Sequence, residues 1–132
     1  MDNAILIWKY LLPQLQSNQE LVKYINPDNM FPLVAKSDTP YPFLIFKREG
    51  ISTNYTKATN GGWVNTVTIS VTIYSDNYTT GAYLINQVRD SLENYTLEND
   101  EIKIYPIEMV ACTESFTSDM FMQQITFNVT TV

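Results

Sequence analysis

Residues 64–74 read Val-Asn-Thr-Val-Thr-Ile-Ser-Val-Thr-Ile-Tyr, and from Thr66 onward hydroxyl and apolar side chains alternate. Successive side chains of a strand lie on opposite faces, so this alternation predicts a strand with one buried and one solvent-facing side. The turn and cap signal Ser75-Asp-Asn77 follows, and apolar residues at helical spacing predict a helix over 79–92. The apolar positions of that helix are Leu84, Ile85, Val88 and Leu92.

A second strand is expected at residues 43–49, which begin Phe-Leu-Ile-Phe after the prolines at 40 and 42. Proline favours an extended entry of this kind. The polar segment 50–62 ends in two glycines and leads into the 64–74 strand, so the pair predicts a β-hairpin with a long loop. Connections of this length are uncommon in compact domains and are often functional. We therefore expect the 50–62 loop to contact a neighbouring molecule.

The N-terminal quarter predicts helices followed by an irregular connector. Apolar residues at spacings of three and four predict N-terminal helices within residues 1–25, with a kink or break at Pro13. Residues 26–42 contain four prolines and are expected to form an irregular connector against the core.

The C-terminal third predicts two more strands. Residues 102–116 form the third, interrupted near Pro106, and the stretch 121–129 forms the fourth. The order α-α-β-β-α-β-β predicts an α+β fold, in which a mostly antiparallel four-stranded sheet carries helices on one face. At 132 residues the chain is expected to be a single domain, 1–132, whose ββαββ core occupies residues 43–132.

Composition argues against an enzyme. The chain has no histidine, so it lacks the commonest general base and the commonest metal ligand. Its single cysteine, Cys112, forbids an internal disulfide and a multi-thiolate zinc site, and its strand position predicts a buried, inert thiol. The acidic run 98–101 lacks the spacing of a calcium loop. We expect no catalytic, cofactor-binding or metal-binding residues, and no membrane span.

Charge is distributed unevenly along this acidic chain, which has a formal net charge of -6. Residues 90–119 contain eight acids and only one base, Lys103. Such a surface repels nucleic acid, because binding depends on cations that neutralise phosphates. A solvated, solubilising surface is one interpretation, and an acidic wall past which polyanions slide is the other. The candidate residues for an acidic lumen or partner face are Glu98, Asp100, Glu101, Glu108, Glu114 and Asp119.

Four stretches give the chain a family resemblance. They are Met30-Phe-Pro-Leu-Val34, Pro42-Phe-Leu-Ile-Phe46, Val67-Thr-Ile-Ser-Val-Thr-Ile-Tyr-Ser75 and Gly81-Ala-Tyr-Leu-Ile-Asn-Gln-Val-Arg-Asp-Ser-Leu92. In these apolar patterns the chain resembles the tail completion, or tail terminator, proteins of tailed bacteriophages. These small α+β proteins form rings at the neck or at the head-proximal end of the tail.

The resemblance implies a structural virion protein, made in the host cytoplasm and located at the neck or head-proximal tail. It implies a homo-oligomeric ring, a hexamer or higher, that joins the tail tube to the head connector on the portal side. DNA would pass through the ring without specific binding. A head-to-tail ring needs two different complementary patches. The candidate subunit-contact residues are Lys47, Arg48, Asn54, Tyr55 and Lys57.

Two other functions remain open at this stage. The first is a small acidic binding or adaptor module whose 90–119 stretch binds a basic protein with salt-sensitive association. The second is an enzyme that uses carboxylates such as Glu98, Asp100 and Glu101. Replacing these three acids with amides would abolish the activity of such an enzyme.

Overall fold

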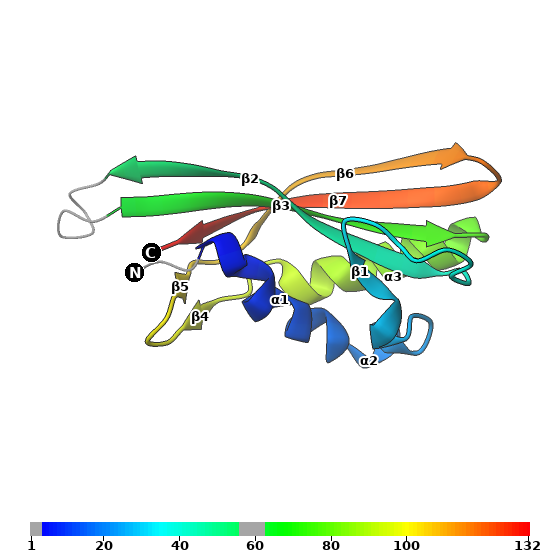
Figure 1. The fold of residues 1–132 in the computed structure, drawn as a ribbon, viewed down its shortest axis with the longest axis horizontal. Helices are drawn as coiled ribbons and strands as arrows, with labels where there is room; N and C mark the ends of the chain where they lie inside the picture. The colour runs from blue at the N-terminus through cyan, green and yellow to red at the C-terminus, as the bar shows by residue number, and fades with distance from the viewer. Residues whose placement is uncertain (1–3, 56–62) are drawn as a thin grey trace.

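The computed structural model of the chain describes residues 4–55 and 63–132. Its helices are η1 (Ala4–Leu6), α1 (Ile7–Gln16), α2 (Gln19–Val22), η2 (Pro27–Asn29) and α3 (Tyr78–Leu92). Its strands are β1 (Met30–Pro32), β2 (Phe43–Tyr55), β3 (Trp63–Ser75), β4 (Leu97–Glu98), β5 (Lys103–Ile104), β6 (Glu108–Thr117) and β7 (Met120–Thr131). Figure 1 shows the long strands crossing in a twisted sheet above the helices.

The strands form one seven-stranded sheet in the order β1-β2-β3-β7-β5-β4, with β6 also paired to β7. β1 runs parallel to β2, and the other pairs are antiparallel. The predicted fold class, a mostly antiparallel four-stranded sheet with helices on one face, is therefore wrong: the sheet is larger and mixed. The predicted strand at 64–74 and helix at 79–92 are confirmed by β3 and α3.

Prolines account for much of the difference. The connector expected at 26–42 contributes β1, because the extended backbone next to Pro32 pairs with β2. The single strand expected at 102–116 is divided into β5 and β6 on either side of Pro106, which has no N–H to donate. Pro13 does not break α1, which continues to Gln16.

Strand β2 is longer than expected. β2 continues through Tyr55, so residues 50–55 belong to the strand and not to the predicted 50–62 loop. A register shift between Arg48 and Gly50 marks a β-bulge in this strand. The rest of the predicted loop, residues 56–62, lies outside the described residues.

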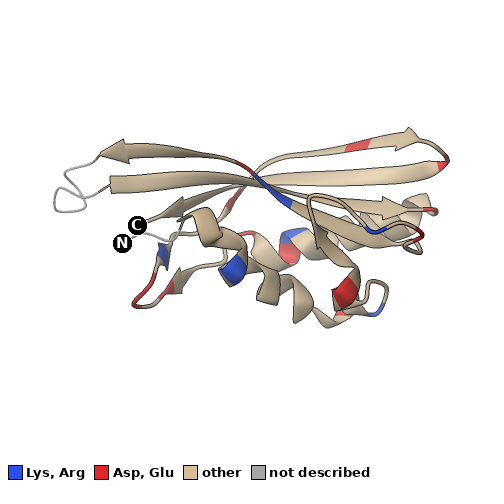
Figure 2. Ribbon diagram, in the orientation of Figure 1, with Lys and Arg blue, Asp and Glu red and all other residues tan. Residues whose placement is uncertain are grey.

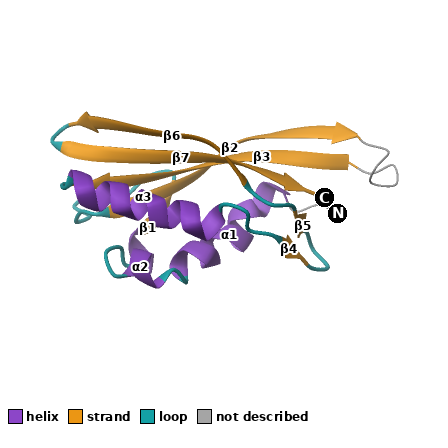
Figure 3. Ribbon diagram, turned by 180° about the vertical axis from the view of Figure 1, so that it is seen from behind, coloured by secondary structure: helices purple, strands orange, loops and turns teal. Residues whose placement is uncertain are grey.

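The core lies between the sheet and the helices. Alternate residues of β3, namely Val67, Ile69, Val71 and Ile73, are fully buried. They share the core with Ile125, Phe127 and Val129 of β7 and with Leu84, Val88 and Leu92 of α3. Figure 3 shows α3 lying along the sheet with α1 and α2 beside it. We call the opposite side of β2, β3, β6 and β7 the open face.

Two long hairpins leave this core in opposite directions (Figure 1). The first, which we call the β2 arm, consists of residues 47–55 with their partners 63–70 on β3. The second, the β6 arm, consists of residues 108–117 with their partners 120–128 on β7. The two arms point in opposite directions because each ends at the start of β3 or β7, and these two strands run antiparallel over residues 65–75 and 121–131.

Val71→Asp is expected to unfold the domain, because it introduces a charge into a site that is 0% exposed. Burying an unpaired charge costs at least about 3 kcal/mol, a large part of a small domain's stability. Thermal denaturation followed by circular dichroism measures the loss. The matched control is Val110→Asp on β6, where the side chain is 55% exposed and little change is expected. Equal melting temperatures for the two variants would contradict this core assignment.

Candidate interaction surfaces

The β6 arm presents a strand edge to solvent. Within the described residues β6 pairs only with β7, so the backbone groups on its other side have no strand partner. All of its residues are exposed except Met109, which is half-buried. Val110 is 55% and Phe116 58% exposed. Exposed strand edges are templates for pairing with another chain, and here the edge carries large apolar side chains.

The β2 arm presents a second edge. β1 covers only the first part of β2, where Met30, Phe31 and Pro32 pair with residues 44–46. From Lys47 to Tyr55, β2 pairs only with β3 in the described part of the chain. All nine of these residues are exposed.

Four of the five predicted contact residues lie on this β2 edge. Cross-strand partners share a face of a sheet, so Lys47 and Asn54 lie on the open face and Arg48 and Tyr55 on the helix side. Tyr55 packs edge to face against Trp63, with ring centroids 5.3 Å apart. The fifth predicted residue, Lys57, lies outside the described residues.

The two cations on this edge have partners. The Lys47 Nζ is 3.0 Å from Glu49 Oε1, and this hydrogen bond holds the pKa of the Glu49 carboxyl below its ordinary value. Arg48 donates from Nη1 to the Ile5 backbone oxygen at 3.0 Å. It also lines a hollow whose other members are Ile5, Trp8, Pro32, Leu33, Phe46 and Lys47.

The six predicted acidic residues are divided between two parts of the molecule (Figure 2). Glu98, Asp100 and Glu101 belong to the β4–β5 hairpin. Glu108 and Glu114 lie on β6 opposite Asn128 and Gln123, on different faces of the sheet. Asp119 lies in the turn between β6 and β7 with a positive φ of 61°. These six acids are close in the sequence, but they do not form one continuous acidic face.

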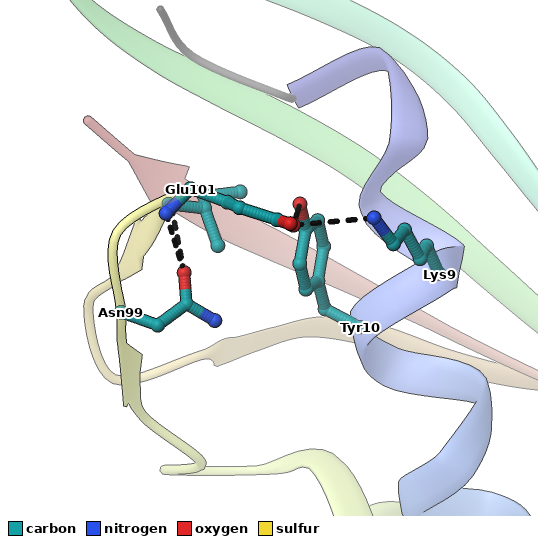
Figure 4. Close-up of polar contacts among 5 residues, drawn as sticks. Lys9, Tyr10, Asn99 and Glu101 are labelled. Atoms are coloured by element: carbon teal, nitrogen blue, oxygen red, sulfur yellow. Dashed lines mark hydrogen bonds and ion pairs between the residues drawn. The ribbon is translucent and has the colours of Figure 1, made fainter.

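Glu101 fastens the β4–β5 hairpin to α1. Its Oε2 accepts hydrogen bonds from the Tyr10 hydroxyl at 2.6 Å and from Lys9 at 3.2 Å (Figure 4). The Asn99 Oδ1 accepts hydrogen bonds from the backbone N–H groups of Glu101 and Ile102, and these bonds shape the turn between β4 and β5. The Tyr10 and Lys9 hydrogen bonds lower the pKa of the Glu101 carboxyl. This acid therefore has a structural role.

Glu114 is also held by neighbours. Gln123 donates to its Oε2 at 3.0 Å and the Tyr78 hydroxyl donates at 2.8 Å. These hydrogen bonds lower the pKa of Glu114, and the carboxylate raises the pKa of Tyr78. A shallow hollow is formed here by Tyr78, Glu114, Ser115, Phe116, Phe121 and Gln123. The β6 arm therefore presents a fixed negative charge beside exposed aromatic rings.

Sequence reasoning missed the exposure of β6. Cys112 was expected to be buried, yet the strand exposes it. Partial desolvation still raises the pKa of its thiol. Val110 and Phe116 were likewise not singled out. No sequence signal distinguishes them, because apolar residues on an exposed arm resemble those of a half-buried strand.

The open face carries few charges. Along β3 and β7 it is formed mainly by Thr66, Thr68, Ser70, Thr72, Gln124, Thr126, Asn128 and Thr130. Thr68 donates a hydrogen bond to Asn128 across the two strands at 2.9 Å. This face is therefore hydroxyl- and amide-rich, with Lys47 and Glu108 at its two sides.

Residues 4–55 and 63–132 contain no group of three or more acidic or cysteine side chains arranged to hold a metal ion. In the same residues no helix has the length and apolar character needed to cross a membrane.

Comparison with solved structures finds the same fold in a chain of the structure described as "Virion of native gene transfer agent (GTA) particle". The TM-score is 0.78, and the match covers 92% of this chain and 90% of that one. At 13% sequence identity the similarity shows a common fold. Searches against protein-family models and against curated proteins find no match.

The Glu101 contacts predict a pH-dependent difference between the wild-type protein and Glu101→Gln. The folded-state pKa of Glu101 is lowered from its ordinary 4.5, so its stabilising contribution is complete above that value. The contribution is lost as the pH falls through the lower folded-state pKa. The difference in melting temperature should therefore be present at pH 7 and shrink toward zero in acid. A difference independent of pH would contradict this role.

Proposed function

We propose that this chain is a structural virion protein of a tailed phage or phage-like particle. More specifically, it is a ring-forming tail terminator, tail completion or neck subunit that joins the tail tube to the head connector on the portal side. It acts by contact and catalyses no reaction. The main observation in support is that the fold has two exposed strand edges, one on the β2 arm and one on the β6 arm, and that these arms point in opposite directions.

Two further observations support the proposal. The fold matches a chain from a gene transfer agent virion over nearly the whole length of both chains. In addition, the two edges differ in side-chain chemistry, as a head-to-tail contact requires. The β2 edge carries Lys47, Arg48 and Glu49, a net charge of about +1, whereas β6 carries Glu108 and Glu114 and no base.

In this proposal the subunit-contact residues are Lys47, Arg48, Asn54, Tyr55 and Lys57, and DNA passes along the open face. Nucleic-acid affinity depends on cations at phosphates, and Lys47, the cation of β2 on that face, is paired with Glu49. Of the six acids, Glu108 borders the passage. The other five, Glu98, Asp100, Glu101, Glu114 and Asp119, belong to the outer surfaces that meet the neighbouring copy, the tail tube or the connector.

The test is the mass of the protein in solution, measured by light scattering over a concentration series and followed by negative-stain imaging. We expect a concentration-dependent shift from monomer to one defined closed ring. Mixing with tail or connector protein should promote ring formation if the free protein remains monomeric. A monomer at tens of micromolar that also binds neither protein would contradict the proposal.

A further inference from the structure

The directions of the strands allow β6 of one copy to pair with β2 of another. Across the sheet the order β2-β3-β7-β6 alternates in direction, because each adjacent pair is antiparallel. β6 therefore runs antiparallel to β2. Rotation about a ring axis keeps each strand's direction relative to that axis, so β6 of one copy meets β2 of the next as an antiparallel partner.

The two free edges also match in length and pattern. The free part of β2 contains nine residues, 47–55, with a register shift at Glu49. The free part of β6 contains ten, 108–117, with a register shift at Val110. Thr117 opposite Lys47 and Met109 opposite Tyr55 define a register that pairs the two edges throughout. In this register open-face residues oppose open-face residues and helix-side residues oppose helix-side residues, with one bulge in each strand.

We propose that the outer edge of β6 in one copy forms an antiparallel ladder in this register with the β2 edge of the next copy. The proposal rests on the ring-forming function given above and identifies the contact that closes the ring. The opposed pairs are 117 with 47, 116 with 48, 115 with 50, 114 with 51, 113 with 52, 112 with 53, 111 with 54, and 109 with 55.

The side chains brought together are complementary. Phe116 lies opposite Arg48, and cations favour aromatic faces. Glu114 lies diagonal to the same arginine, within reach of its long side chain. Met109 lies opposite Tyr55, and thioethers pack well on aromatic rings. The ladder therefore covers the exposed Phe116 ring and brings the acidic β6 edge to Arg48, the cation of the β2 edge that has no carboxylate partner among the described ion pairs.

The β6–β7 turn gives a further match. With Thr117 opposite Lys47, the turn that carries Asp119 lies over the hollow formed by Trp8, Leu33, Phe46 and their neighbours. Trp8 lines this hollow, and its buried indole N–H has no hydrogen-bond partner among the described residues.

The register also agrees with the geometry of a closed barrel. Within one copy, Thr113 of β6 lies opposite Gln124 of β7, which lies opposite Thr72 of β3. Ser52 of β2 lies opposite Thr66 of β3. Thr72 and Thr66 are six residues apart on β3, so pairing Thr113 with Ser52 displaces each copy from the next by six residues along the strand direction for every four strands. At about 3.3 Å per residue and 4.8 Å per strand, this stagger tilts the strands by about 45°. Closed barrels have tilts of about 35–45°. The tilt does not depend on the number of copies.

Disulfide trapping tests the register. Thr53→Cys places a second thiol opposite the native Cys112 of the neighbouring copy. Within one copy β3 and β7 separate these positions, beyond the roughly 7 Å Cα separation that a disulfide spans. Mild oxidation should give disulfide-linked multimers on non-reducing gels, several-fold more than in the wild-type protein, which has Cys112 alone. Cys112→Ser in the same variant should abolish them.

The matched control is Ser52→Cys, one residue away on the open face, which should cross-link much less. Asn54→Cys with Ala111→Cys, in a Cys112→Ser background, tests the same register from the open face if Thr53→Cys fails to fold. Rings by light scattering without selective cross-linking in either design would overturn the register and leave the proposed function standing. A wild-type chain that forms no ring, alone or with tail or connector protein, would overturn both.

Discussion

The ladder between β3 and β7 positions the rest of the molecule. It joins residues 65–75 to residues 121–131, and its alternate side chains build the core against α3. Because β3 and β7 are antiparallel and each is the second strand of its hairpin, the β2–β3 and β6–β7 hairpins point in opposite directions. One stretch of pairing thus provides both the buried centre and the displacement of the two arms.

The outer edges of the two arms have backbone N–H and C=O groups that pair with no other strand in the described part of the chain. In an isolated copy, water bonds to their outer N–H and C=O groups, and each such hydrogen bond differs from a protein hydrogen bond by only about 1 kcal/mol. Backbone pairing between the β6 edge of one copy and the β2 edge of the next therefore gives modest affinity by itself. In the proposed contact, the additional energy and the specificity of register come from the exposed Phe116 ring, the fixed charge of Glu114 and the cation of Arg48. Natural proteins protect such edges or use them for assembly, and here both edges are long.

The sequence predicted the parts governed by local physics. Alternation over 64–74 identified β3 and its buried residues, and Asn77 caps α3 by accepting the Thr80 N–H. Pairing that depends on distant segments was not predictable: β1 needs β2, and the division at Pro106 needs β7. The exposure of Phe116 and Cys112 was also missed, because an exposed edge strand that contains apolar residues cannot be told from a core strand by its sequence pattern. The acidic residues 98–119 were adjacent in sequence, but two separate hairpins carry them.

Amide hydrogen–deuterium exchange, measured below and above the assembly concentration, tests most directly whether the two free edges make the assembly contact. We predict that protection rises in both 47–55 and 108–117 on assembly, while the already paired residues 67–73 of β3 remain protected throughout. Unchanged exchange in both edge segments of an assembled sample would show that the copies meet elsewhere and would contradict the account.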